Sequence, residues 1–315
     1  MKKYVIGADI GGTLIKMGLF SVDGNLLDFW EIETRKNKSG AYILRDTADS
    51  VKKKIAEKGI SYDEIEGMGI GVPGPVDSEG NVDGCTNLGW GRKNVCNEAE
   101  QLTGFKVKAG NDANLAALGE TWMGGGRSFD DLVMMTFGTG VGGGIVLNGK
   151  ILNGCRGSAG EIGHLKMSDT ENLKCGCGNT GCLEQYVSAS RFAEITAVYL
   201  KEHPEEKSLM RNFEDLTCKD IFDCARDGDI LAEKMVDNAC RMIGKACAMI
   251  ACVVDPQVFV FGGGMSKAGQ ILLDGIEKYF REYAFHTQKN TRLALAQLGN
   301  KAGIYGAAKL VIRDE

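Results

Sequence analysis

One short stretch of the chain concentrates side chains that can bind a metal ion. Residues 161–184 contain His164, Cys175, Cys177 and Cys182. One histidine with three cysteines is a common tetrahedral ligand set for structural zinc. Buried free cysteines can also act simply as small apolar side chains. The spacing C-x-C-G-x-x-G-C, close to one of only three histidines in the chain, favours a zinc site.

Carboxylates lie at both ends of this stretch, and their chemistry suits a sugar. Carboxylates, amides and imidazoles can each satisfy several sugar hydroxyls. Glu161 and Glu184 are of this kind, as are Asn87 and Asn111 elsewhere in the chain. His164 can bind zinc through only one ring nitrogen, which leaves the other free to donate a hydrogen bond. We therefore expect zinc to brace a sugar-binding loop without taking part in the reaction.

Three glycine-rich turns could supply backbone N–H donors to phosphate groups. They lie at residues 11–13, 138–143 and 262–264, each after an apolar run. Residues 138–143 match the pattern G-x-G-x-x-G, but a strand follows where a dinucleotide-binding motif requires a helix. The P-loop pattern G-x-x-x-x-G-K-[ST] is absent from the sequence. The first two turns mirror each other, and they predict phosphate binding from two domains.

Two aspartates next to these turns predict phosphoryl-transfer chemistry. Asp9 precedes the first turn and suits a magnesium ion that keeps several of its waters. Lys16 could add a positive charge there, although an exposed strand lysine is an equal alternative. Asp112 is expected between a strand and a helix, where it could be a plain helix cap. Its amide neighbours Asn111 and Asn114 favour a general base that accepts the proton of an attacking hydroxyl.

The elements that must position these residues occur twice. Residues 4–32 read as strand, Gly/Thr turn, strand, tight turn and strand, and residues 132–152 repeat this order. Such an echo predicts two halves of one architecture, each offering a glycine turn to a shared cleft. Residues 77–94 read as a loop. The main domain boundary is expected near residues 111–126.

Composition excludes several classes of protein. The chain has 315 residues, 43% of them apolar, and a net charge of −5, with no basic run longer than Lys52–Lys54. Residues 1–12 lack the long apolar region and cleavage site of a signal peptide, and no basic patch is evident, so neither secretion nor nucleic-acid binding is expected. The longest apolar run, at 246–254, is too short to cross a membrane. Eleven cysteines without a secretion signal predict a reducing, cytoplasmic location.

These features together resemble the ROK family of bacterial sugar kinases and repressors, and its glucokinases in particular. The match spans essentially the whole chain. It rests on Asp9-Ile-Gly-Gly-Thr13 with Lys16, Gly71-Val-Pro-Gly-Pro-Val-Asp77, Thr86-Asn-Leu-Gly-Trp90, Asn111-Asp-Ala-Asn114, Gly138-Thr-Gly-Val-Gly-Gly143, Glu161-Ile-Gly-His164, Cys175-Gly-Cys-Gly178 with Gly181-Cys-Leu-Glu184, and Asp255-Pro256 leading to Gly262-Gly-Gly264.

The resemblance implies a two-domain α/β fold of the actin-like ATPase, ribonuclease H-like kind, with an interdomain active-site cleft and usually a homodimer. The domains would be residues 1–115 with a C-terminal helix at about 301–315, and residues 116–300. Asp112 would be the catalytic base. The substrate would be bound by Gly74, Asn87, Asn111, Asp112, Glu161, His164 and Glu184. ATP and Mg²⁺ would be bound by Asp9, Gly11, Gly12, Thr13, Lys16, Thr139, Gly140, Gly262 and Gly263, and Zn²⁺ by His164, Cys175, Cys177 and Cys182.

The expected activity is phosphorylation of the 6-hydroxyl of a hexose by ATP, with glucose first. N-acetylmannosamine, N-acetylglucosamine, mannose and fructose are alternative substrates, because the loops that would distinguish them are not settled by sequence. The segment Asn87-Leu-Gly-Trp90 is one residue shorter than the common glucokinase pattern. A non-catalytic sugar sensor is a further alternative, but family repressors carry a helix-turn-helix ahead of the first strand, and here that strand is expected from residue 3.

Overall fold

The structure is a computed structural model that describes residues 2–170 and 173–312. Contacts divide the chain into two compact units. The first unit contains residues 1–130, 144–160 and 297–315, and the second contains residues 131–143 and 161–296. Residues 171–172 of the cysteine-rich stretch and residues 313–315 of the expected terminal helix region lie outside the described residues.

The first unit is built on a five-stranded mixed sheet in the order β3-β2-β1-β4-β7. The predicted meander forms its antiparallel half, because β2 pairs with both β1 and β3. The parallel half adds β4 beside β1 and β7 beside β4. The bounds are β1 Tyr4–Ile10, β2 Leu14–Ser21, β3 Leu26–Glu33, β4 Ile65–Val72 and β7 Val107–Asn111.

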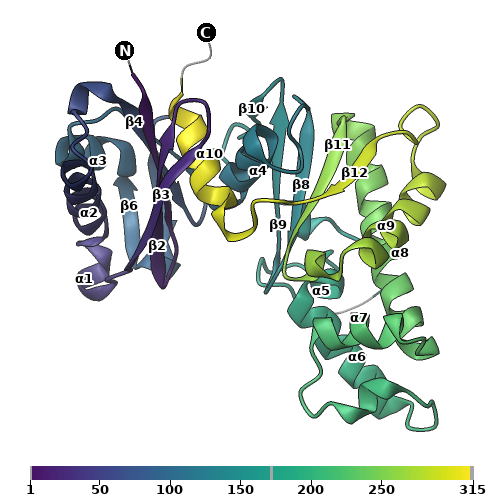
Figure 1. The fold of residues 1–315 in the computed structure, drawn as a ribbon. Coiled ribbons are helices and arrows are strands. Elements are labelled where there is room, and N and C mark those ends of the chain that lie inside the picture. Colours follow the sequence, from purple (N-terminus) through teal and green to yellow (C-terminus); the bar gives the residue numbers. More distant parts are fainter. Residues whose placement is uncertain (1, 171–172, 313–315) are drawn as a thin grey trace. The chain divides into compact units, whose positions relative to one another are not determined.

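Helices cover both faces of this sheet (Figure 1). On one face, α2 (Ile43–Glu57) and α3 (Val95–Thr103) bury their apolar residues in a core with alternate residues of the strands. On the other face, α10 (Ala302–Val311) packs against Val5 and Phe20, and it contacts α4 (Asp112–Met123). The short helix α1 spans Asn37–Gly40. The terminal helix therefore returns to the N-terminal sheet.

Two glycines allow α10 to approach the sheet backbone closely. A Cβ atom on Gly7 would lie 2.0 Å from the carbonyl oxygen of Ile304, and one on Gly69 would lie 1.7 Å from that of Ala307. No side chain fits at such distances. Since side chains alternate along a strand, Asp9 shares the α10 face of β1 with Val5 and Gly7.

The prediction of a loop over residues 77–94 is wrong in part. Two short strands, β5 (Asn81–Cys85) and β6 (Trp90–Asn94), pair antiparallel and flank a single turn of 3₁₀-helix at Thr86–Leu88. The segment is rich in polar residues and glycine, which hides its strand pattern. Val82, Cys85 and Trp90 are nevertheless buried and hold the pair against the core.

The second sheet repeats the order of the first. It runs β10-β9-β8-β11-β12, with β9 antiparallel to β10 and β11 parallel to both β8 and β12. The predicted echo of strand and glycine turn is confirmed, and it extends to all five strands. The bounds are β8 Leu132–Phe137, β9 Val141–Leu147, β10 Lys150–Ile151, β11 Val258–Gly263 and β12 Arg292–Leu295.

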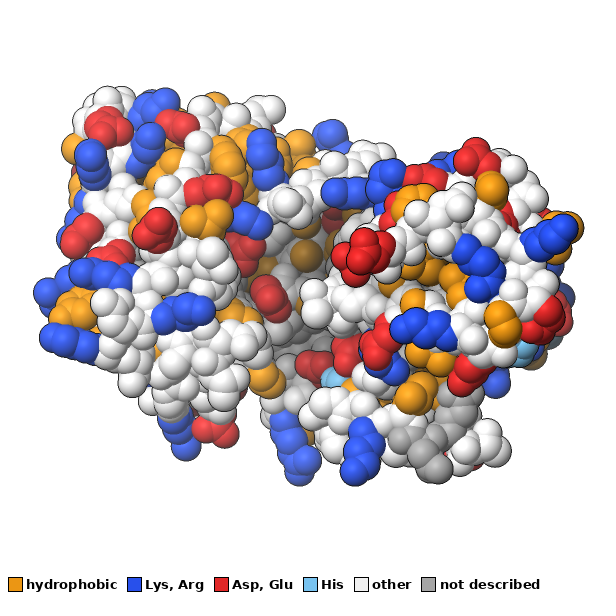
Figure 2. All heavy atoms as spheres, turned by 90° about the horizontal axis from the view of Figure 1, so that it is seen from below, with side chains coloured by type: hydrophobic (Ala, Val, Ile, Leu, Met, Phe, Trp, Pro, Cys, Tyr) orange, Lys and Arg blue, Asp and Glu red, His pale blue; other side chains and the backbone are white. Residues whose placement is uncertain are grey.

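The helices of the second unit include the long α8 (Ile230–Val254), which packs along α9 (Gln270–Tyr283). The others are α5 (Glu184–Val187), α6 (Ala189–Glu202) and α7 (Cys218–Arg226). In the part of the chain that the structure describes, none of the helices combines the length and apolarity needed to span a bilayer. Figure 2 shows basic and acidic side chains interspersed over the face that it displays.

Candidate active site and metal cluster

Strand pairing gathers several predicted residues at one edge of the first sheet. Asp9 of β1 lies opposite Gly71 of β4, and Val72 of β4 lies opposite Asn111 of β7. Because these three strands are parallel, their carboxyl ends meet at the same edge. This register brings Asp9, the Pro73–Pro75 turn and Asn111 together from positions about 100 residues apart in sequence.

Asn111, rather than Asp112, caps the helix that follows β7. The side-chain oxygen of Asn111 accepts from the N–H groups of Ala113 and Asn114 at 3.0 and 3.1 Å, and its amide donates to the carbonyl oxygen of Gly74 at 3.2 Å. Asp112 is the first residue of α4 and is exposed. The helix cap is thus supplied by its neighbour, while Oδ1 of Asp112 accepts from the N–H of Ala113 at 2.9 Å.

Asp9 and Asp112 influence each other electrostatically. Burial raises the pKa of the Asp9 carboxyl to about 6, and the negative charge of Asp112 adds to this shift. The positive charge of Lys16 opposes it. A carboxylate held in this way gains from a nearby cation, which is the environment that a magnesium-binding aspartate requires.

The first glycine turn is held in place by its surroundings. The N–H of Gly11 donates to the carbonyl oxygen of Leu14 at 3.0 Å, and the buried Thr34 hydroxyl donates to the carbonyl oxygen of Gly11 at 2.7 Å. Thr13 is exposed. A Cβ atom on Gly12 would lie 3.7 Å from the carbonyl oxygen of Asn87, so the predicted phosphate turn and the predicted sugar loop are neighbours.

In the second unit, two glycine turns lie at the carboxyl ends of adjacent parallel strands. β8 ends at Phe137, opposite Gly263 of β11. The turn after β8 is tight, because the N–H of Gly138 donates to the carbonyl oxygen of Gly140 at 2.9 Å, and Thr139 at its tip is exposed. Gly263 has a φ of 83°, and a Cβ atom there would lie 2.4 Å from the carbonyl oxygen of Phe137. Only glycine fits this position.

Glu184 touches the turn after β8. Its Oε2 atom accepts from the N–H of Val141 at 3.0 Å, and a Cβ atom on Gly140 would lie 2.4 Å from the same oxygen. Sequence analysis assigned Glu184 to the sugar and Gly140 to the nucleotide as separate features. The structure places the two in direct contact.

The four predicted zinc ligands form one cluster. Their ligand atoms all lie within 4.8 Å of one another. The Sγ atoms of Cys177 and Cys182 are 3.7 Å apart, and the Sγ of Cys175 is 3.5 Å from Nδ1 of His164. Bond lengths of about 2.3 Å for Zn–S and about 2.1 Å for Zn–N in a tetrahedron require separations of roughly 3.5–3.8 Å. Two of the six separations match this range and all lie within 4.8 Å, so the residues present are compatible with a tetrahedral zinc ion.

His164 turns one ring nitrogen to the cysteines and the other away from them. Nδ1 faces Cys175, while Nε2 lies 3.9 Å from Oε2 of Glu161. The Sγ of Cys175 also lies 3.8 Å from Oε1 of Glu184. The cluster therefore contacts both glutamates that the sequence assigned to the sugar.

The thiols of the cluster differ in acidity. A hydrogen bond from the backbone N–H of Asn179 lowers the pKa of Cys177. Burial, reinforced by the two neighbouring thiols, raises the pKa of Cys182 to about 12. A metal ion binds the thiolate form and has to displace these protons, so its affinity would depend on pH.

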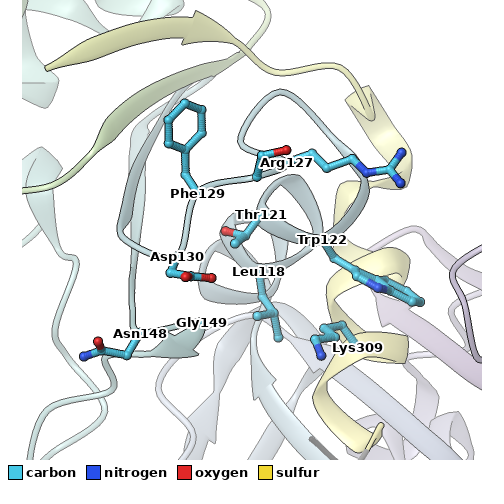
Figure 3. Close-up of a pocket in the computed structure, with 10 residues that line it drawn as sticks. Leu118, Thr121, Trp122, Arg127, Phe129, Asp130, Asn148, Gly149 and Lys309 are labelled. Atoms are coloured by element: carbon cyan, nitrogen blue, oxygen red, sulfur yellow. The ribbon is translucent and has the colours of Figure 1, made fainter.

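A separate pocket of about 340 Å³ lies within the first unit (Figure 3). Figure 3 shows Trp122 of α4, Lys309 of α10 and Arg127 of the following loop around it. None of its lining residues belongs to the predicted active site.

Sequence analysis missed Glu120. Its side chain is fully buried in α4 and accepts hydrogen bonds from backbone N–H groups on two separate segments. The available signal was a glutamate within the run Leu115–Trp122, which is otherwise apolar except for Thr121, four residues ahead of three consecutive glycines. The partners of its carboxylate are backbone N–H groups, which the sequence alone does not identify.

Comparison with known proteins identifies the class. The model of the family described as "ROK family" matches residues 5–314, so the chain belongs to the ROK family. The predicted resemblance and the predicted α/β, actin-like ATPase fold are confirmed.

Three relatives illustrate the likeness. The chain is 39% identical to a glucokinase of Halalkalibacterium halodurans, over 99% of this chain and 96% of the relative. It is 34% identical to the crystal structure of a ROK family glucokinase from Streptomyces griseus in complex with glucose and AMPPNP, with a TM-score of 0.75 and 98% of each chain covered. It is 29% identical to an N-acetyl-D-glucosamine kinase of Histophilus somni, over 97% of this chain and 98% of the relative.

Proposed function

We propose that this protein is an ATP-dependent sugar kinase that phosphorylates the 6-hydroxyl of glucose. The observation that carries the proposal is the gathering of Asp9, Gly74, Asn111 and Asp112 at one edge of the first sheet. It is supported by the relative from Streptomyces griseus, whose structure contains glucose and AMPPNP.

Asp112 would act as the general base. A base must reach the reacting hydroxyl, and an exposed carboxylate at the first residue of a helix meets this requirement. Asn111, which precedes the base, caps the helix and also donates to the Gly74 turn. These two hydrogen bonds fix the backbone next to Asp112. The proton of the sugar hydroxyl would pass to the Asp112 carboxylate as the oxygen attacks the terminal phosphorus of ATP.

Backbone N–H groups of the glycine turns would hold the phosphates. Each of these three turns carries an exposed residue, namely Thr13, Thr139 and Gly263. Lys16 would add a positive charge to the first turn. Mg²⁺, held through water by Asp9, would neutralise charge on the transferred phosphoryl group.

As the family resemblance implies, the sugar would be bound by Asn87, Asn111, Glu161, His164 and Glu184. A zinc ion held by His164 and the three cysteines would fix the loop that carries the last three of these residues. Its part would be structural, because His164 and the three cysteines would fill all four of its positions. We further propose a homodimer and a cytoplasmic location, as the family resemblance and the cysteine content predict.

Another hexose is the second candidate substrate. The likeness to an N-acetyl-D-glucosamine kinase and the short Asn87–Trp90 loop both favour testing it. A coupled assay of ADP release with glucose, N-acetylglucosamine, N-acetylmannosamine, mannose and fructose distinguishes these possibilities. We expect the highest kcat/KM with glucose. ADP release with none of the five sugars would contradict the proposal and favour a sugar-sensing protein.

A further inference from the structure

Glu120 is a buried carboxylate that links three parts of the first unit. It belongs to α4, eight residues after Asp112, and its side chain has no exposed surface. Its Oε2 accepts from the N–H of Gly125 at 2.7 Å, and its Oε1 accepts from the N–H of Leu298 at 2.8 Å. The N–H of Gln297 lies within 3.1 Å of both oxygens. A buried carboxylate is stabilised when several N–H groups point at it.

The segment anchored by Glu120 reaches two residues of the predicted phosphate site. Residues 297–301 lead into α10, and Gly303 is the second residue of that helix. The carbonyl oxygen of Asn300 accepts from Nζ of Lys16 at 3.5 Å. A Cβ atom on Gly303 would lie 2.9 Å from Oδ2 of Asp9. The same few residues therefore contact Glu120 at one end and the Asp9 carboxylate at the other.

Close packing between α4 and α10 leaves little freedom for this segment. A Cβ atom on Gly119 would lie 2.3 Å from the carbonyl oxygen of Ala302, and one on Gly306 would lie 1.7 Å from that of Leu115. The two helices thus touch along their backbones, and Figure 3 shows them side by side. Because packed backbones transmit small shifts, releasing residues 297–298 would alter the position of Gly303 beside Asp9.

We propose that Glu120 is a positioning residue for phosphoryl transfer, which acts by fixing residues 297–303 against Asp9 and Lys16. The inference rests on the proposed function. It assigns Glu120 no contact with either substrate. Its effect should therefore fall on binding of the magnesium–nucleotide pair and on kcat, while the affinity for the sugar stays unchanged.

The test compares Glu120→Gln with Gly303→Ala. The glutamine keeps one acceptor oxygen but turns an NH₂ group toward backbone donors, so one part of the anchor is lost. The alanine leaves Glu120 intact and places a methyl group against Asp9. Loss of a supporting group beside a metal-binding residue typically costs about 10- to 100-fold in affinity or activity. We expect losses of that size in kcat/KM for ATP with both variants.

A matched control is Asp229→Asn in the second unit. Asp229 is also a buried carboxylate that accepts from backbone N–H groups, those of Leu209 and Ala232. We expect this variant to keep the wild-type kcat/KM for ATP. Glucose affinity, measured by calorimetry without nucleotide, should be unchanged in all three variants.

Hydrogen exchange at the amides of Gln297 and Leu298 shows whether the anchor has been released. If Glu120→Gln exchanges these amides fast but keeps wild-type turnover, the proposal is overturned. If Glu120→Gln does not fold, wild-type turnover in Gly303→Ala overturns it. If the wild type phosphorylates no hexose, the proposed function fails separately. In that case the positioning role is tested by calorimetry, which measures the affinity of each protein for Mg²⁺ with a non-hydrolysable ATP analogue. Equal affinity in wild type and Glu120→Gln would overturn the positioning role.

Discussion

At the residue scale, Asp9 is a carboxylate whose position weakens the fold. Its pKa is raised from 3.8 to about 6, mainly by burial and also by Asp112. A carboxyl group with a raised pKa contributes stability while it is protonated, and this contribution is lost as the pH rises through about pH 6. At neutral pH the ionised Asp9 carboxylate therefore destabilises the folded state, as expected for a residue whose function is to bind a cation.

The first prediction concerns Asp9→Asn. In the presence of a chelator and without nucleotide, the variant should have a free energy of unfolding at about pH 7 that exceeds the wild-type value by up to about 3 kcal/mol. The difference should disappear near pH 4, where the wild-type carboxyl is protonated. Urea unfolding at several pH values measures this. A variant less stable than wild type at neutral pH would contradict the assignment.

The second prediction concerns the contact between Gly140 and Glu184. In Gly140→Ala the new methyl group would displace the Glu184 carboxylate and break its bond with the N–H of Val141. We expect a loss of about 0.5–1.5 kcal/mol in stability, the usual net contribution of one hydrogen bond, and a weaker affinity for glucose. Gly138→Ala is the control for stability, since a Cβ atom there would meet no atom within 4 Å. Thermal unfolding and calorimetry compare the two variants, and equal stability would contradict the prediction.

At the scale of elements, sequence patterns predicted what is local. The meander of β1 to β3, its echo in β8 to β10, and α4 after Asn111 follow from periodicity, tight turns and glycines within one short window. The pair β5 and β6 could not be read in this way, because its residues are polar and only Val82, Cys85 and Trp90 reveal its buried side.

The cysteine cluster is likewise a local element whose geometry was predictable. Four ligands within 19 residues can meet only if the loop folds back on itself, and the structure brings them together. Its contact with Glu184, and through Glu184 with the turn after β8, was not predictable. That contact depends on tertiary packing.

The third prediction concerns the metal. Purified wild-type protein should contain about one zinc ion per chain, the number that a single four-ligand site holds, and Cys177→Ser should contain less. Because zinc displaces thiol protons, it should be released as the pH falls from about pH 8 to about pH 5. Metal analysis and a colorimetric chelator assay measure both quantities. Equal zinc content in the two proteins would exclude the site.

Removing zinc should also affect the affinities for the two substrates differently. The metal-free protein should lose affinity for glucose, because Glu161, His164 and Glu184 depend on the loop. We expect its affinity for the magnesium complex of an ATP analogue to be affected less. Calorimetry with each ligand, before and after chelation, checks this expectation. Equal losses for both ligands would indicate general unfolding instead.

At the scale of the whole molecule, the remaining features depend on contacts between distant parts of the chain. The parallel order β1-β4-β7 brings Asp9 and Asn111 to one edge, and α10 returns about 300 residues later to cover the same sheet. Glu120 has a role only after this return, because its partners Gln297 and Leu298 are 177 and 178 residues away. Periodicity in a short window carries no information on such pairs.

The account as a whole depends on Asp112 as the base. The most direct measurement is the kcat of Asp112→Asn with glucose and ATP, together with its affinity for glucose. We expect kcat to fall by about 10²- to 10⁴-fold, the usual contribution of a general base, while the dissociation constant for glucose stays at the wild-type value. A variant that retains most of the wild-type kcat would contradict the account.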